Sequence, residues 1–148
     1  MPTKIEHGFY IEDLEVGMFR ESKHDVSEQD VEDFARISGD YNPLHMDEEY
    51  AKTTSFGGRI AHGAMTASYV SAILGNELPG PGAVFTTLEL KFRAPVRIGD
   101  TVTARAEVAE VNVRRRRVIL DMRCMVGDTI IAKGKAGVMV DARPTEDT

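Results

Sequence analysis

The chain has 148 residues, is 42% hydrophobic and carries a formal net charge of −6, so it is long enough for one domain with a sizeable core. The excess of acidic residues argues against a general nucleic-acid binder, because non-specific affinity for phosphate backbones comes mostly from Lys and Arg. The single cysteine, Cys124, cannot form an internal disulfide, so the fold is not expected to depend on oxidising conditions.

The N-terminal segment MPTKIEHGFYIEDLEVG places a charged residue every few positions and lacks the apolar core of a signal peptide. The longest run without charge, Ile60–Asn76, falls short of the roughly 20 strongly apolar residues that a membrane span needs. We therefore expect a cytoplasmic protein that does not bind membranes.

The stretch SEQDVEDFARISGD predicts the first helix. Ser27 suits the N-cap, and the acidic residue three positions later brings the pattern close to a capping box. Apolar residues then follow at helical spacing, and Gly39 suits a helix stop. The segment DYNPLH is therefore expected to be the loop directly after this helix, and a second short helix is expected from Asp47.

From Gly63 the sequence GAMTASYVSAILGNEL is apolar or small on all sides, which predicts a helix surrounded by protein and ended by Pro79–Gly82. Apolar and polar residues alternate at period two in the segments 84–93, 102–108, 118–126 and 130–140. The pair Gly127–Asp128 offers a two-residue hairpin turn. We expect three or four long strands in a meander.

A buried helix followed by antiparallel strands with one apolar face is most simply accommodated by a sheet that curves around the helix. The predicted class is α+β. We expect one domain over residues 1–148, with a core of about 10–142 and a short polar tail, RPTEDT.

Asp40 and His45 flank an Asn-Pro pair. Pro43 restricts its own φ and pushes Asn42 toward an extended conformation, so the loop has little freedom. Such stiffness suits two side chains that converge on one water or one substrate atom. The alternative is an Asx-type turn in which Asp40 caps the helix end and His45 is exposed. The residues alone leave both interpretations open.

The segment FGGRIAHG precedes the apolar helix. A glycine at this point lets a ligand approach the first free N–H groups, where the helix dipole favours negative charge, so Gly63 is a candidate oxyanion donor. Turn geometry alone would also explain Gly57, Gly58 and Gly63. We interpret His62 as a packed histidine hydrogen-bonded to the backbone.

Other chemistries find less support. A phosphate loop is excluded because no Lys-Ser/Thr pair follows Gly63. No metal is expected, because no familiar ligand spacing matches Asp40, His45, Asp47 and His62. Ser71 lies two helical turns after Gly63 but lacks the context of a nucleophile. Cys124 lies on an apolar strand face, which is typical of an inert core thiol.

Four consecutive arginines stand between two strand patterns: Arg114, Arg115, Arg116 and Arg117. They form either a solvated strand end or a contact with the phosphates of a nucleotide-bearing substrate, whose geometry arginine matches well. The residues leave both open.

Three motifs, FARISGDYNPLHMD, FGGRIAHGAMTASYVS and LELKFRAPVRIGDTV, together resemble the MaoC-like (R)-specific enoyl-CoA hydratases, which are single-hotdog enzymes. The resemblance covers roughly residues 27–140. It implies the hotdog fold, a long central helix wrapped by a curved antiparallel sheet. It also implies a homodimer, or a higher oligomer of dimers, in which two sheets join side by side.

The same resemblance implies the roles of single residues. The D-x-N-P-x-H motif places the catalytic dyad on Asp40 and His45 and includes Asn42. The N–H of Gly63 would bind the thioester oxygen, and Ser71 would help to hold the dyad. The candidates for contacts with the coenzyme A phosphates are Arg93, Arg114, Arg115, Arg116 and Arg117.

The implied reaction is the reversible hydration of trans-2-enoyl-CoA to (R)-3-hydroxyacyl-CoA, without a metal or other cofactor, because coenzyme A is part of the substrate. Two alternatives stay open: an acyl-CoA thioesterase, and a non-catalytic acyl-CoA-binding hotdog module. The motif around Asp40 and His45 favours hydration, because a pure binder needs no pair of titratable groups. Short to medium acyl chains are expected. The sequence does not decide which residue of the pair is the base.

Overall fold

The structure is a computed structural model that describes residues 6–145. Parts of the N-terminal segment and of the polar tail considered above lie outside the described residues. Among the described residues, no helix is long and apolar enough to cross a membrane.

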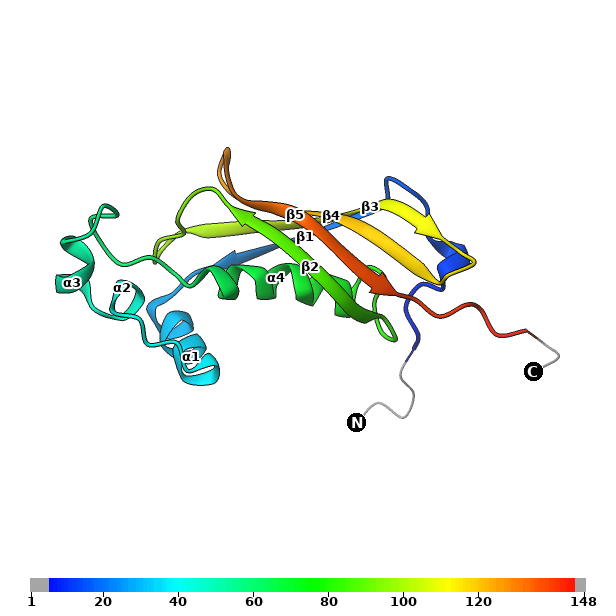
Figure 1. The fold of residues 1–148 in the computed structure, drawn as a ribbon, viewed down its shortest axis with the longest axis horizontal. Helices are drawn as coiled ribbons and strands as arrows, with labels where there is room; N and C mark the ends of the chain where they lie inside the picture. The colour runs from blue at the N-terminus through cyan, green and yellow to red at the C-terminus, as the bar shows by residue number, and fades with distance from the viewer. Residues whose placement is uncertain (1–5, 146–148) are drawn as a thin grey trace.

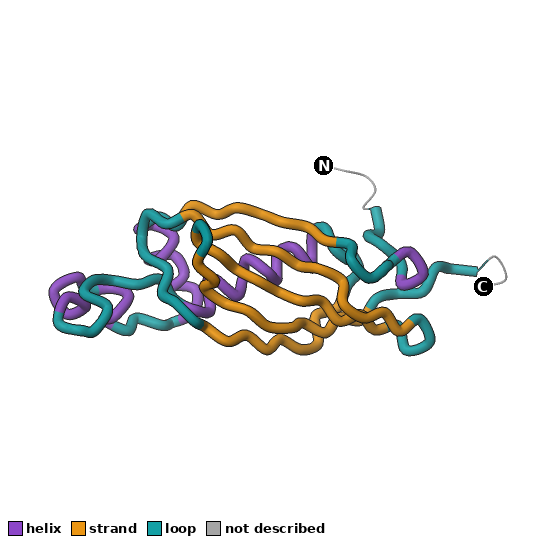
Figure 2. Tube along the Cα trace, turned by 90° about the horizontal axis from the view of Figure 1, so that it is seen from above, coloured by secondary structure: helices purple, strands orange, loops and turns teal. Residues whose placement is uncertain are grey.

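Five antiparallel strands form a single sheet in the order β1-β3-β4-β5-β2, and this sheet curves over the longest helix, α4 (Figure 1, Figure 2). The strands are β1 Phe19–Asp25, β2 Val84–Phe92, β3 Thr101–Asn112, β4 Arg117–Val126 and β5 Thr129–Met139. The helices are the 3-10 turn η1 Ile11–Asp13 and the α-helices α1 Glu28–Ser38, α2 Pro43–Met46, α3 Glu48–Lys52 and α4 Gly63–Asn76.

The core lies between the sheet and one side of α4. Alternate residues of β3 are fully buried, and they continue into the alternating apolar residues of β4. The side of α4 that faces the sheet supplies the buried residues Met65, Thr66, Val70, Ile73 and Leu74. The predicted α+β architecture, a curved sheet around a long helix, is confirmed.

The expectation that α4 is surrounded by protein on all sides is wrong for the single chain. The sheet covers only one side of the helix, and the other side exposes the small residues Ala64, Ser68, Ser71, Ala72 and Gly75. Because these residues are small and uncharged, the sequence pattern did not distinguish this exposed stripe from the buried side of the helix.

The expected meander is correct only for β3, β4 and β5. The strand after α4, β2, pairs with β5 at one edge of the sheet, and the chain then crosses to β3 on the far side of β4. β1 was not predicted at all. Its sequence, FRESKHD, holds one apolar residue and no buried side chain, so its alternation carried no hydrophobic signal.

The predicted helix ends are confirmed for α1 and α3. Ser27 and Asp30 form a reciprocal capping box at the start of α1, and Gly39 ends this helix with φ of 80°. Asp47 caps α3 through its side chain. The predicted Gly127–Asp128 hairpin turn joins β4 to β5. The three short helices α1 to α3 gather at one end of the sheet, beside the start of α4 (Figure 1).

Candidate active site

The Asp40–His45 segment is built from two successive side-chain turns. The Asp40 carboxylate accepts a hydrogen bond from the Asn42 N–H at 3.1 Å, and the Asn42 side-chain oxygen accepts one from the Leu44 N–H at 3.0 Å. Asn42 thereby caps α2, and Pro43 fills its first position, where no N–H donor is needed. The expected plain loop is therefore a short helix, and the Asx turn at Asp40 is part of its approach.

His45 is buried, with 9% of its surface exposed, so the alternative of an Asx-type turn with an exposed histidine is wrong. Its Nδ1–H donates to the Ile60 carbonyl at 2.8 Å. Because a carbonyl oxygen only accepts, the neutral ring must carry its proton on Nδ1. This leaves Nε2 as an unprotonated acceptor.

His62 is 1% exposed, and its Nε2–H donates to the backbone carbonyl of Asp40 at 2.9 Å. The interpretation of His62 as a packed, backbone-bonded histidine is confirmed. The ring also lies 4.2 Å from that of His45, centroid to centroid, and its Nδ1 is buried without a hydrogen-bond partner. His62, the N-cap residue of α4, thus fixes the Asp40 turn to the start of this helix.

Asp40, His45 and His62 converge. One potential ligand atom of each lies within 4.8 Å of the other two. In the described part of the chain, no hydrogen bond joins the Asp40 carboxylate to either imidazole. Polar groups at this separation suit a bridging water. By donor type the three could also hold a metal ion, whereas Asp47, considered with them above, caps α3 instead.

A mostly apolar cavity of roughly 340 Å³ opens beside His45. Gly63, the first residue of α4, lines it, and the N–H groups of a first helical turn have no acceptor within the helix. The N-cap residue, His62, makes no capping hydrogen bond with its side chain. The cavity therefore meets the positive end of a helix dipole at a residue without a side chain. Its apolar walls include Ile60, Ala61, Val96 and Ile131.

The size of residue 63 matters, because a Cβ atom there would lie 3.2 Å from two ring atoms of Phe92. Thr66, which the sequence analysis did not single out, lines the same cavity one helical turn after Gly63 and is buried. Thr66 could have been identified from the sequence, because a residue three positions after Gly63 lies on the same face of the helix.

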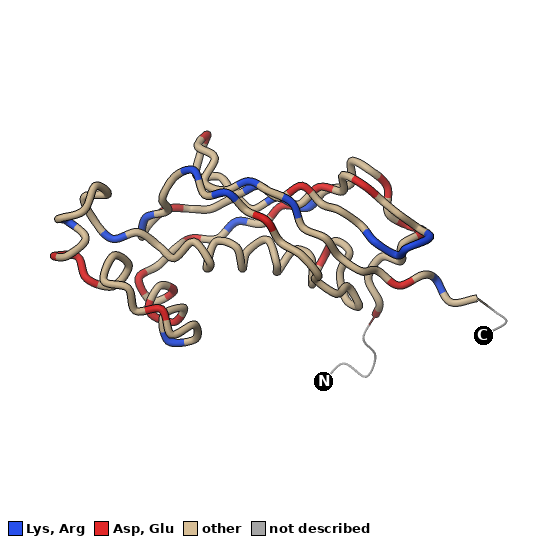
Figure 3. Tube along the Cα trace, viewed as in Figure 1, with Lys and Arg blue, Asp and Glu red and all other residues tan. Residues whose placement is uncertain are grey.

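The remaining predicted site residues lie in different places. Arg93 lines the cavity. Ser71 is exposed on α4, eight residues or about 12 Å of helix beyond Gly63, and does not line it. The arginines 114–117 occupy the β3–β4 turn and the first residue of β4, at the end of the sheet away from α1 to α3 (Figure 3). Within one chain they are not brought to Asp40 and His45.

Cys124 lies in the core of β4, and burial raises the pKa of its thiol to about 11. The thiolate is therefore scarce at neutral pH. This agrees with the predicted inert core thiol.

Residues 15–126 match a family model described as MaoC like domain. Over 93% of its length the chain is 51% identical to a 3-hydroxybutyryl-CoA dehydratase of Methylorubrum extorquens, of which 88% is covered. Over 90% of its length it is 46% identical to an (R)-specific enoyl-CoA hydratase of Rhodospirillum rubrum, of which 93% is covered. The structure is similar to an (R)-hydratase from A. caviae with a TM-score of 0.84, at 36% identity, over 87% of this chain and 98% of that one.

Proposed function

The chain belongs to the MaoC-like dehydratase family, and from this premise we propose that it catalyses the reversible hydration of trans-2-enoyl-CoA to (R)-3-hydroxyacyl-CoA. Two relatives that are 51% and 46% identical over 93% and 90% of this chain are named as a 3-hydroxybutyryl-CoA dehydratase and an (R)-specific enoyl-CoA hydratase. The structural observation that carries the proposal is the convergence of Asp40 with His45, which itself lines a cavity that also meets the start of α4 at Gly63.

The thioester oxygen of the substrate would accept a hydrogen bond from the Gly63 N–H. Attack of water at C3 moves negative charge onto this oxygen, so a donor fixed at a helix start stabilises the transition state more than the ground state. One such donor is typically worth about 3 kcal/mol. The acyl chain would lie along the apolar walls of the cavity.

His45 is the residue that we assign as the base. The hydrogen bond from its Nδ1–H to Ile60 leaves Nε2 free to take a proton from a water held between it and the Asp40 carboxylate. The hydroxide then bonds to C3, the C2–C3 double bond becomes a single bond, and the proton passes from Nε2 to C2. Asp40 would orient the water and stabilise the imidazolium while it exists.

No step of this scheme needs a metal ion or another cofactor, because the protein groups supply the proton transfer and the oxyanion donor. Coenzyme A enters and leaves as part of the substrate. The activity is expected to persist after dialysis against a chelator.

The proposed enzyme is a homodimer joined at β2. This strand forms an edge of the sheet, where its residues Val84, Phe85 and Phe92 and the neighbouring Met139 of β5 are 40–55% exposed. Antiparallel pairing with the same strand of a second copy would satisfy its backbone groups and cover these side chains. A two-fold axis at this edge would also bring the partner's β3–β4 turn to the end of the sheet that holds this chain's site.

The test is an assay with crotonyl-CoA that follows three signals: the absorbance of the conjugated thioester, the chirality of the product and the free thiol. We expect loss of absorbance, an (R)-3-hydroxy product and no thiol. Release of thiol without hydration would identify a thioesterase instead. Tight binding without any absorbance change would identify a binding module.

A further inference from the structure

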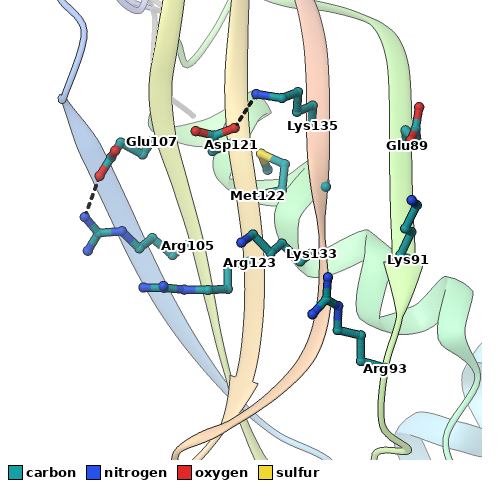
Figure 4. Close-up of a pocket in the computed structure, with 11 residues that line it drawn as sticks. Glu89, Lys91, Arg93, Arg105, Glu107, Asp121, Met122, Arg123, Lys133 and Lys135 are labelled. Atoms are coloured by element: carbon teal, nitrogen blue, oxygen red, sulfur yellow. Dashed lines mark hydrogen bonds and ion pairs between the residues drawn. The ribbon is translucent and has the colours of Figure 1, made fainter.

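The outer face of the sheet, away from α4, carries a row of cations in register. Lys91 on β2 lies opposite Lys133 on β5, Lys133 lies opposite Arg123 on β4, and Arg123 lies opposite Arg105 on β3. Figure 4 shows these side chains on neighbouring strands of one face. Neighbouring strands are about 4.8 Å apart, so four positive residues stand at close intervals across the sheet.

Only one end of this row is neutralised within the chain. Arg105 pairs with Glu21 at 3.0 Å and with Glu107 at 2.8 Å. The exposed side chains of Lys91, Lys133 and Arg123 form no ion pair with any residue that the structure describes. Like charges directly opposite each other in a sheet are destabilising, so the fold alone gives no reason for this arrangement.

The adjacent row on the same face shows the contrast. Two residues along each strand, Glu89 lies opposite Lys135, and Lys135 lies opposite Asp121. The signs alternate from β2 to β4, where the Lys135 Nζ donates to the Asp121 carboxylate at 2.7 Å, and the row ends with Glu107 of β3 opposite Asp121. The uncompensated positive charge is therefore confined to one row, with carboxylates along one side of it.

The row also leads to the candidate active site. Its cations line a shallow hollow of roughly 630 Å³ on the sheet (Figure 4). Arg93, two residues after Lys91, lines both this hollow and the apolar cavity beside His45. Arg93 has no ion pair with a described residue either. A long ligand whose reactive end lies at Gly63 can therefore continue past Arg93 onto the outer face.

We propose that Arg93, Lys91, Lys133 and Arg123, the outer cation row, bind the phosphate groups of the coenzyme A moiety. The inference rests on the proposed function and assigns the phosphate contacts to this chain's own sheet rather than to the arginines of the β3–β4 turn. A nucleotide with several phosphates suits an extended row better than a single anion does. The bordering carboxylate of Glu89 would repel phosphates placed outside the row.

Two measurements test the proposal on the full chain. Calorimetric titration with coenzyme A alone reads binding without catalysis. The ratio of kcat/KM for crotonyl-CoA to kcat/KM for crotonyl-pantetheine, which lacks the nucleotide phosphates, reads the phosphate contribution to turnover. The variants are Lys133→Ala, Arg123→Ala and their combination, all at exposed positions. The matched control is Lys135→Ala, a lysine of the same hollow that already has a carboxylate partner.

For the double variant we expect at least tenfold weaker binding of coenzyme A and at least a tenfold fall in the ratio. For Lys135→Ala we expect both values to change less than twofold. Unchanged binding and an unchanged ratio in the double variant would overturn the inference. It would also be overturned if Arg115→Ala lowered the coenzyme A affinity and the ratio while the row variants lowered neither. If wild type hydrates neither thioester, the proposed function fails, and the titration still decides whether the row binds the nucleotide.

Discussion

The two histidines of the site differ in the nitrogen that each gives to the backbone. His45 donates from Nδ1 to the Ile60 carbonyl, and His62 donates from Nε2 to the Asp40 carbonyl. Of the two, only His45 lines the cavity. His62 is therefore a positioning residue, which holds the Asp40 turn against the start of α4, and His45 is the residue suited to proton transfer.

The proposed oxyanion site at Gly63 leaves little space for a larger residue. Gly63→Ala places a Cβ atom 3.2 Å from the Phe92 ring, so the ring or the helix start must give way by a few tenths of an ångström, which disturbs the wall of the cavity beside the proposed oxyanion donor. We expect at least a tenfold loss of kcat/KM for crotonyl-CoA, measured by the absorbance assay.

The matched control is Gly75→Ala near the other end of the same helix, where a Cβ atom meets nothing within 4 Å. Replacing an exposed helical glycine by alanine stabilises a protein by about 0.5–1 kcal/mol. Urea unfolding should show this gain, with activity unchanged. Equal activity in the two variants would show that the close contact between residue 63 and Phe92 does not affect catalysis.

At the scale of elements, the sequence predicted those parts of the fold whose signals are local. The capping box at Ser27, the helix stop at Gly39 and the alternation of β3 to β5 depend on residues a few positions apart. β1 could not be predicted in this way, because its backbone is held by pairing with β3, about 80 residues later, rather than by an apolar face. β2 and β3 are consecutive in the sequence but lie apart in the sheet, and this order likewise depends on the whole sheet rather than on local sequence.

The same distinction applies to the site. The stiffness of the Asn42-Pro43 turn was visible in the sequence, whereas the burial of His45 depends on the Ile60 carbonyl, which is 15 residues away. The outer cation row could not be recognised for the same reason, since its members come from β2, β5 and β4 and meet only through the sheet register. The four arginines 114–117, in contrast, are consecutive in the sequence and could be recognised there as a positive cluster.

At the scale of the whole molecule, the two edges of the sheet differ. The β1 edge is mostly polar, and the β2 edge exposes apolar side chains next to the bare side of α4. Sedimentation analysis should give twice the chain mass of 16.3 kDa. Phe85→Glu, which places a charge on the β2 edge, should shift the protein toward monomer because a buried unpaired charge opposes association.

The control for this change is Phe19→Glu on the β1 edge, also an exposed aromatic residue of an edge strand. It should leave the mass at two chains. A wild-type protein that sediments as a single chain would exclude β2 as a stable dimer contact.

The central claim is that Asp40 and His45 act together on one water. Its most direct test is the rate of crotonyl-CoA hydration by Asp40→Asn, His45→Gln and the double variant, with thermal unfolding as the check on the fold. A positioned acid or base contributes on the order of 10² to 10⁴ in rate, so each single variant should lose at least a hundredfold in kcat. Groups that act as a unit are not additive, so the double variant should lose little more than the worse single one. Near-normal turnover in both folded single variants would contradict the claim.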